Sequence, residues 1–329
     1  MNSPLQPTPA DEHLHPLPEG AGRAWRESYY FGFYDERAGV GGFESFGYRA
    51  ARGHSGSMMV IWRPGDVAAA LELGGALEDP TRYQVGGVVA SCVEPFERWD
   101  LQYTGLMPRE PEAAFRCSVD DVKASSTMQE VMVELHATFT AEGWTGRYAQ
   151  QESYRHIFSG CYEQVGRLRG TLRYGEEQFE LDCPSVRHHA WGERDWFKDD
   201  EWNWCTSVLD DGTACGFWYR QEKRGEGQGE VAGWLRMDDE IGQVVAVERE
   251  IVRDPAEPKP VPRKAQYRVH DDHGRELELV ATVRQIVPAF FEPRDDRPLL
   301  HWNDRSLVTF DGSRGPGHGE VEFIEVLEV

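Results

Sequence analysis

The sequence lacks any long apolar run. No segment reaches the roughly 18 consecutive apolar residues that a membrane-spanning helix requires. Residues 1–20 are polar and rich in proline, and they lack the apolar stretch of a signal peptide. We therefore expect a protein that is neither exported nor inserted into a membrane, and we expect it in the cytoplasm.

Basic residues and paired cysteines are also scarce. The chain has 35 Lys and Arg against 57 Asp and Glu, a formal net charge of −22, and no basic cluster longer than two residues. Such a chain repels phosphate backbones, which excludes nucleic acid as a partner. The six cysteines are widely spaced and form no C-x-x-C pair, which predicts reduced thiols rather than a disulfide framework.

Helical periodicity is rare, and only residues 65–73 and 119–126 are short helix candidates. Elsewhere alternating patterns predict strands, as at 131–139, where Val131, Val133 and Leu135 share one face. Turn signals join further pairs of strands, including 168–174 with 178–181, and 202–209 with 214–219 around Asp211-Gly212. The later candidates are 244–252, 265–270, 276–287 and 320–326. Many short strands with few crossover helices indicate antiparallel barrels or sandwiches.

The length of 329 residues favours two domains. We expect residues 1–24 to form a tail that is either floppy or ordered by docking. A glycine-containing polar stretch at 141–152 then predicts a break between a β domain at 25–150 and a second β domain at 151–329.

Three motifs are rejected on context. The Gly53–Gly56 segment resembles a nucleophile elbow, but Ser57 occupies its last glycine position. The glycines at 39–42 lack the strand–helix setting of a dinucleotide loop. His188 and His189 are adjacent, and adjacent residues of a strand point to opposite faces, so they do not form a metal site together. We therefore expect neither a metal nor any other cofactor.

The densest chemistry lies in the eighteen residues from 187 to 204. They include two histidines, two arginines and four tryptophans: His188, His189, Arg187, Arg194, Trp191, Trp196, Trp202 and Trp204. This mixture suits a water-poor pocket with a few placed polar groups.

This segment, with Tyr162-Glu163-Gln164 before it, resembles the second half of the lipocalin-like proteins related to carotenoid 1,2-hydratase and AttH. That group also includes relatives of tocopherol cyclase, kievitone hydratase and lipocalin-like Diels–Alderases. Its usual pattern reads Arg-Asp-His-Ser-Trp-Gly-x-Arg-Asp, and here His188 replaces the aspartate and Ala190 the serine. The resemblance is specific over residues 154–219, and 317–320 also suit the closing strand of the family.

The resemblance implies two tandem lipocalin-like antiparallel β-barrels that hold a hydrophobic ligand. It further implies a cofactor-independent hydratase, dehydratase or cyclase acting on an isoprenoid-, steroid- or polyketide-like molecule. Such chemistry needs a positioned acid in a site closed to bulk water. Asp195 or Glu163 is the candidate acid, and His189 the candidate proton shuttle. The candidate ligand-binding residues are Trp191, Trp196, Trp202, Trp204, Arg187, Arg194 and His188.

Structural alternatives stay open for the same residues. The tryptophans also suit ordinary core packing. Arg187, Arg194 and Asp195 also suit a buried ion-pair network, in which Asp195 is ionised by its neighbour. At the level of function, the alternative is a lipophilic-ligand-binding protein without catalysis.

Overall fold

The computed structural model describes residues 7–77, 79, 81–111, 129–142, 146–147, 154–223, 229–255, 259–291 and 299–328. Within these ranges the regular elements are nineteen strands and two short 3-10 helices, Pro9–Glu12 and Ala50–Arg52. The all-β prediction is therefore confirmed. None of the helices in the described ranges has the length and apolar character needed to cross a membrane.

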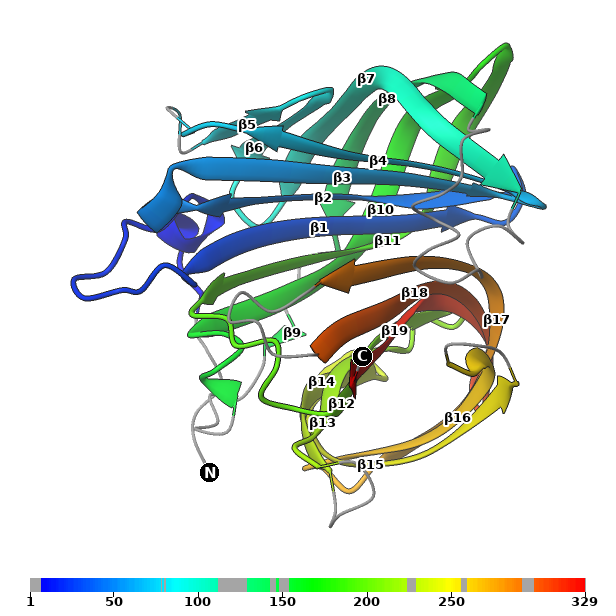
Figure 1. Ribbon diagram of the computed structural model, residues 1–329. Coiled ribbons are helices and arrows are strands. Elements are labelled where there is room, and N and C mark those ends of the chain that lie inside the picture. The colour runs from blue at the N-terminus through cyan, green and yellow to red at the C-terminus, as the bar shows by residue number, and fades with distance from the viewer. Residues whose placement is uncertain are drawn as a thin grey trace. The chain divides into compact units, whose positions relative to one another are not determined.

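The chain divides into two compact units, and among the described residues the division falls between Asp195 and Trp196. The strands of the first unit are β1 (Arg26–Asp35), β2 (Val40–Arg49), β3 (His54–Arg63), β4 (Asp66–Gly74), β5 (Arg82–Val85), β6 (Val88–Glu94), β7 (Arg98–Pro111), β8 (Gln129–Ala141), β9 (Gly146–Arg147), β10 (Gly160–Tyr174) and β11 (Glu177–Gly192). They form one antiparallel sheet in the order β4-β3-β2-β1-β11-β10-β8-β7-β6-β5, with β9 beside β10 (Figure 1).

This first sheet curls back on itself, because β4 also pairs with β7 through residues 66–68 and 109–111. Its concave, inner face carries a large apolar core that includes Tyr29, Phe31, Phe46, Leu168 and Leu181. Alternation along each strand places every second side chain on this face. In β11 the odd-numbered residues that follow Leu181 therefore face the core.

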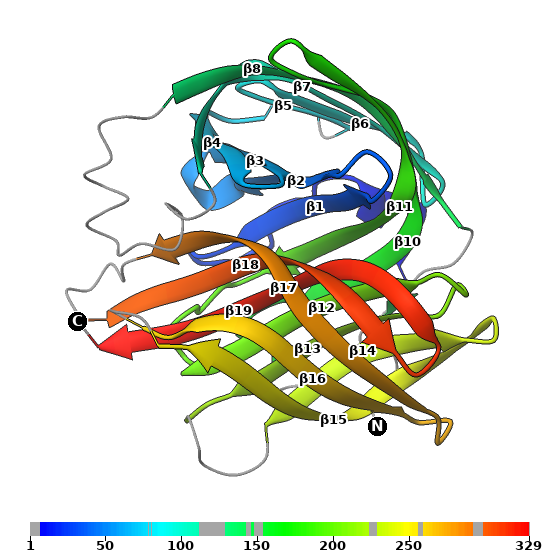
Figure 2. The same ribbon diagram turned by 90° about the vertical axis from the view of Figure 1, so that its right-hand side faces the viewer.

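The second unit is a closed antiparallel barrel of eight strands (Figure 2). They are β12 (Glu201–Leu209), β13 (Ala214–Gln221), β14 (Glu230–Met237), β15 (Glu240–Asp254), β16 (Val261–Asp271), β17 (Glu276–Phe291), β18 (Leu299–Gly312) and β19 (Gly315–Glu328). Pairing of β19 with β12 closes the barrel. The predicted strands and hairpins of this region are confirmed. An Asp-Gly pair favours a type I′ turn, which needs a positive φ at both central residues. At the β12–β13 turn only Gly212 takes a positive φ, of 85°, so this turn is not of type I′.

The helix predicted at residues 65–73 is wrong. This segment is strand β4, which pairs along its length with β3. Its Ala-Ala-Ala-Leu-Glu-Leu run has high helix propensity, but sheet pairing and the burial of Val67 and Ala68 override that preference. The other helix candidate, 119–126, lies outside the described residues.

The expected division at residue 150 also differs from the structure. Strands β8 and β10 lie on either side of that break, and they pair with each other over nine residues. Residues 187–195, which match the family pattern, are called the signature. Strand β11 carries its residues 187–192 and pairs with both β10 and β1. The signature strand therefore belongs to the first unit. Of the expected tail, residues 7–24 are ordered against this unit, and Glu12 is 0% exposed, which favours the docked alternative.

Candidate functional site

Strand β11 presents its signature residues alternately to the two faces of the first sheet. Arg187, His189 and Trp191 lie on the inner face, where the ring of His189 stacks on that of Tyr29 at 3.9 Å. His188 lies on the opposite face. The alternation expected for the two adjacent histidines is thus confirmed, and only His189 faces the core of this unit.

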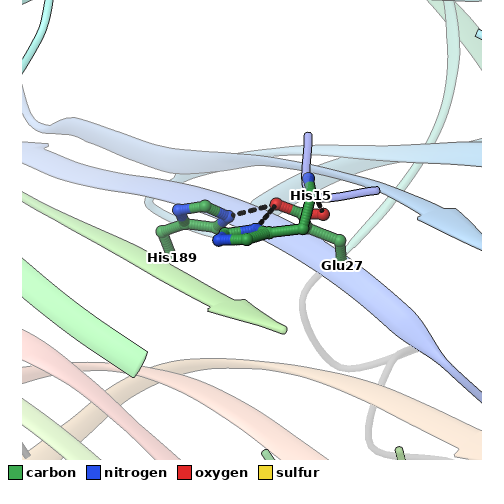
Figure 3. Close-up of side chains that lie close together, drawn as sticks. All are labelled: His15, Glu27 and His189. Carbon is green, nitrogen blue, oxygen red and sulfur yellow. Dashed lines mark hydrogen bonds and ion pairs between the residues drawn. The ribbon is translucent and has the colours of Figure 1, made fainter. Parts of the chain in front are cut away.

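His189 belongs to a cluster with His15 and Glu27 (Figure 3). Its Nε2 lies 2.9 Å from Oε1 of Glu27, and Nδ1 of His15 lies 2.8 Å from the same oxygen. The backbone N–H of His15 donates to the other oxygen of Glu27 at 2.8 Å, and the outer Nε2 of His15 lies 2.9 Å from a carboxylate oxygen of Asp11. One buried carboxylate therefore holds two imidazoles.

These contacts fix where the protons lie. Burial alone would raise the pKa of Glu27, but hydrogen bonds from His15 and His189 outweigh burial and lower it to about 2. Burial opposes the charging of His15, yet its bonds to Glu27 and Asp11 raise its pKa. Because both ring nitrogens of His15 meet carboxylates, which only accept, this ring is an imidazolium. Burial lowers the pKa of His189, so that ring is neutral and carries its proton on Nε2.

Tyr162 extends this network on the other side of His189. Its hydroxyl lies 3.2 Å from Nδ1 of His189 and donates at 2.5 Å to Oε1 of Glu12. The hydroxyl has one proton and three acceptors within reach, because the backbone carbonyl of Asp11 also lies 3.2 Å away. When that proton is directed to Glu12, Nδ1 of His189 has a free lone pair. His189 is thereby set up to accept a proton while Glu27 holds its other nitrogen.

Glu12 also anchors Arg187. The guanidinium donates to Glu12 and, through Nε at 2.7 Å, to the side-chain oxygen of Gln164. Trp99 donates to the second oxygen of Glu12 at 2.7 Å. Burial alone would raise the pKa of Glu12, but the charge of Arg187 and these hydrogen bonds lower it. The docked tail thus supplies the counter-charge of a buried signature arginine.

One group of side chains in the described ranges has the composition of a metal site. The ligand atoms of His15, Glu27 and His189 all lie within 4.8 Å of one another. Three such ligands are the number in many catalytic zinc sites. In the structure, however, the imidazole N–H groups point at the carboxylate, and an imidazolium at His15 offers no lone pair to an ion. The hydrogen-bonded form therefore accounts for all three residues.

The structure does not bring Glu163 or Asp195 to His189. Glu163 is buried on the opposite face of the sheet, where its Oε1 lies 3.1 Å from Nδ1 of His188. Asp195 is exposed, and its backbone N–H donates to the carbonyl of His156 at 2.7 Å. In the alternative of an ion-pair network, Asp195 pairs with Arg187 or Arg194; in the structure Arg187 pairs with Glu12 instead.

Arg194 is buried, and burial lowers its pKa to about 10.

Of the candidate ligand-binding tryptophans, only Trp191 lies in the first unit; Trp196, Trp202 and Trp204 belong to the second unit. Trp196 packs on Trp202 at 5.1 Å between ring centroids, and Trp204 stacks on Trp218 at 5.9 Å. Trp202 also contacts Trp218, so the four rings form one aromatic cluster there.

Sequence reasoning missed Glu12, His15 and Glu27. A usable signal existed for Glu27, which is in phase with Tyr29 and Phe31 on one face of β1. An acid in register with an apolar face predicts a buried carboxylate with a partner. No comparable signal marks Glu12 or His15, because they lie in a proline-rich segment without strand periodicity.

Solved structures with the same fold cover nearly the whole chain. An AttH-like protein from Nitrosomonas europaea matches with a TM-score of 0.64 at 13% identity, covering 94% of this chain and 99% of its own. CghA matches with a TM-score of 0.58 at 11% identity, covering 93% and 89%. Kievitone hydratase from Nectria haematococca matches with a TM-score of 0.53 at 12% identity, covering 98% and 96%. The resemblance seen in the sequence is thus confirmed at the level of the fold.

No curated protein matches the sequence significantly. The model of the family described as domain of unknown function DUF7064 matches residues 8–324. That match spans both units and includes Glu12, His15, Glu27 and His189. The chain therefore belongs to the DUF7064 family.

Proposed function

We propose that the protein is a cofactor-independent enzyme that moves protons on a hydrophobic small molecule, as a hydratase, dehydratase or cyclase. The observation that carries the proposal is the neutral His189, held between the ionised Glu27 and the hydroxyl of Tyr162. A histidine in this position takes up a proton at Nδ1, and the charge it gains is stabilised by Glu27.

Glu27 then acts as the orienting group. It fixes the Nε2 proton of His189 and keeps Nδ1 as the reactive nitrogen, as the third member of a catalytic triad does. The surroundings suit cationic intermediates, because the rings of Tyr29 and Trp191 lie 3.9 Å and 5.0 Å from the ring of His189. Aromatic faces stabilise developing positive charge most strongly where water is excluded.

The fold supports this reading. Among the structural neighbours, kievitone hydratase is named as a hydratase, and CghA has a structure with Sch210972 bound. An isoprenoid-, steroid- or polyketide-like substrate remains our proposal for this chain. Because Asp195 is exposed and Glu163 faces away from the core, we assign neither as the partner of His189.

The alternative is a lipophilic-ligand-binding protein without catalysis. The aromatic and apolar inner face of the first unit favours it, since a barrel lined with such side chains encloses an apolar ligand without any chemistry. In that case the His15–Glu27–His189 cluster has a structural role, and the protein releases its ligand chemically unchanged.

Mass spectrometry of molecules that co-purify with the protein identifies the compound to test. Turnover in deuterium oxide is then expected to place deuterium on carbon, or to add or remove one water. His189→Gln is expected to lower the rate by about 10²–10⁴-fold. The control is Asp195→Asn, which alters an exposed carboxylate and is expected to keep full activity. An unchanged ligand, recovered at full occupancy without exchange, would favour the binding protein.

A further inference from the structure

The second unit carries a cavity of about 540 Å³ that is open to solvent and is lined by residues of β12, β15 and β19 and by Lys259 and Pro260. This volume lies within the range of small-molecule sites. The proposal that follows concerns this unit alone and does not rest on the proposed function.

The cavity forms where β15 leaves its neighbour. Strand β14 pairs with β15 over only four residues, from Glu240 to Gln243, while β15 continues beside β16 to Asp254. In this extension Arg249, Ile251 and Arg253 alternate onto the same face, and all three line the cavity. The barrel wall thus bears two guanidinium groups with an apolar side chain between them.

The two arginines differ in how fully they are engaged. Arg249 pairs with Glu201 at 2.8 Å and lies over the ring of Tyr219 at 3.9 Å, so its position is fixed. Arg253 donates through Nη2 to Glu325 at 3.0 Å. Its Nη1 is buried and has no acceptor among the residues that the structure describes. A buried charged donor without an acceptor is costly, and a ligand oxygen removes that cost.

The cations of the cavity wall are each paired with a carboxylate. Lys259 also lines the cavity, and it pairs with Glu325 at 3.4 Å and with Asp304, which is not part of the lining. Counted with Asp304, three cations face three carboxylates, so the donor left for an anion is the unengaged Nη1 of Arg253.

The remaining lining residues Ile251, Pro260 and Leu327 are apolar. A ligand that fits both the arginine side chain and these apolar side chains has one anionic group and an apolar body. We infer that this cavity binds a small organic carboxylate whose headgroup is held by Arg253 and whose apolar body packs on Ile251 and Leu327.

The test uses cis-parinaric acid, a carboxylate that fluoresces in apolar surroundings, and its uncharged methyl ester. We expect the acid to bind at least tenfold more tightly than the ester, because a charge-assisted hydrogen bond is lost in the ester. Arg253→Gln is expected to remove this preference, while Arg253→Lys keeps part of it. The control is Arg263→Gln, the same change at a residue of this barrel outside the cavity, which is expected to preserve the preference.

A second variant tests the location without altering charge. Ile251→Trp fills the cavity and is expected to weaken both probes, with circular dichroism and the melting temperature showing that the barrel remains folded. Equal affinity for acid and ester would overturn the proposal. So would full acid binding by a folded Arg253→Gln protein, or binding that is unaffected by Ile251→Trp.

Discussion

Glu12 and Arg187 lie 175 positions apart in the chain and form an ion pair in which both side chains are at most 1% exposed. The pair joins the docked tail to the signature strand. Each partner is also held by neutral groups, Glu12 by Trp99 and Arg187 by Gln164. The tail is therefore part of the folded first unit and part of the candidate site.

Glu12→Gln is expected to destabilise the protein by about 3–5 kcal/mol, because it leaves the buried guanidinium of Arg187 without a counter-charge. Urea unfolding measures this free energy. Glu19→Gln makes the same change at an exposed position of the same segment and is expected to have little effect. Equal unfolding midpoints for the two variants would mean that the tail is not docked in solution.

Glu27 is expected to make the protein sensitive to acid. Its pKa falls from 4.5 to about 2 on folding, so its contribution to stability is complete above pH 4.5 and is lost as pH falls towards 2. The shift corresponds to about 3 kcal/mol. Unfolding free energies measured between pH 5 and pH 2 should therefore fall more steeply for the wild type than for Glu27→Gln. Parallel curves would contradict an ionised, hydrogen-bonded Glu27.

The local sequence pattern was sufficient to predict most strands and to predict which face of the sheet each signature residue occupies. Alternation in residues 131–139 predicts β8, and the same rule separates His188 from His189. The helix prediction at residues 65–73 failed because local pattern and tertiary setting disagree there. The alanine-rich run of β4 takes its extended conformation from pairing with its neighbour β3. Secondary structure was predictable wherever the chain's own pattern agreed with its tertiary setting.

The candidate site was predictable only in part, because the residues that contact His189 come from parts of the chain far from it in sequence. His189 was identified from its motif, but Glu27 meets it only through the pairing of β1 with β11. No spacing in the sequence encodes that register. Glu163 lies next to Tyr162 in the chain, yet alternation sends the two to opposite faces. Trp196 and Trp202 follow the signature closely but belong to the second unit.

The purified protein is expected to contain no stoichiometric metal. A protonated His15 and the direct contacts of both imidazoles with Glu27 occupy the groups that an ion would need. Elemental analysis should therefore find less than one metal per chain, and EDTA should leave the melting temperature unchanged. If zinc or iron is found, it should disappear in His15→Ala and remain in His188→Ala, because His188 lies on the other face.

Glu44 presents the reverse case to Glu27 on the same inner face. It is 1% exposed, its neighbours across the sheet are Phe31 and Met59, and neither of its oxygens has a hydrogen-bond partner among the described residues. Burial raises the pKa of Glu44 well above 4.5. Its carboxyl is thus neutral, a proton donor among aromatic and apolar side chains.

A carboxyl whose pKa rises on folding costs stability above pH 4.5, because the unfolded chain ionises while the folded chain does not. Glu44→Gln removes this pH-dependent cost and is expected to stabilise the protein at pH 7 relative to the wild type. The gain should shrink as pH falls towards 4.5. Urea unfolding at several pH values measures it, with Glu176→Gln in the exposed β10–β11 turn as the control. A difference between Glu44→Gln and the wild type that does not change between pH 4.5 and pH 7 would contradict the raised pKa and would remove Glu44 as a buried acid.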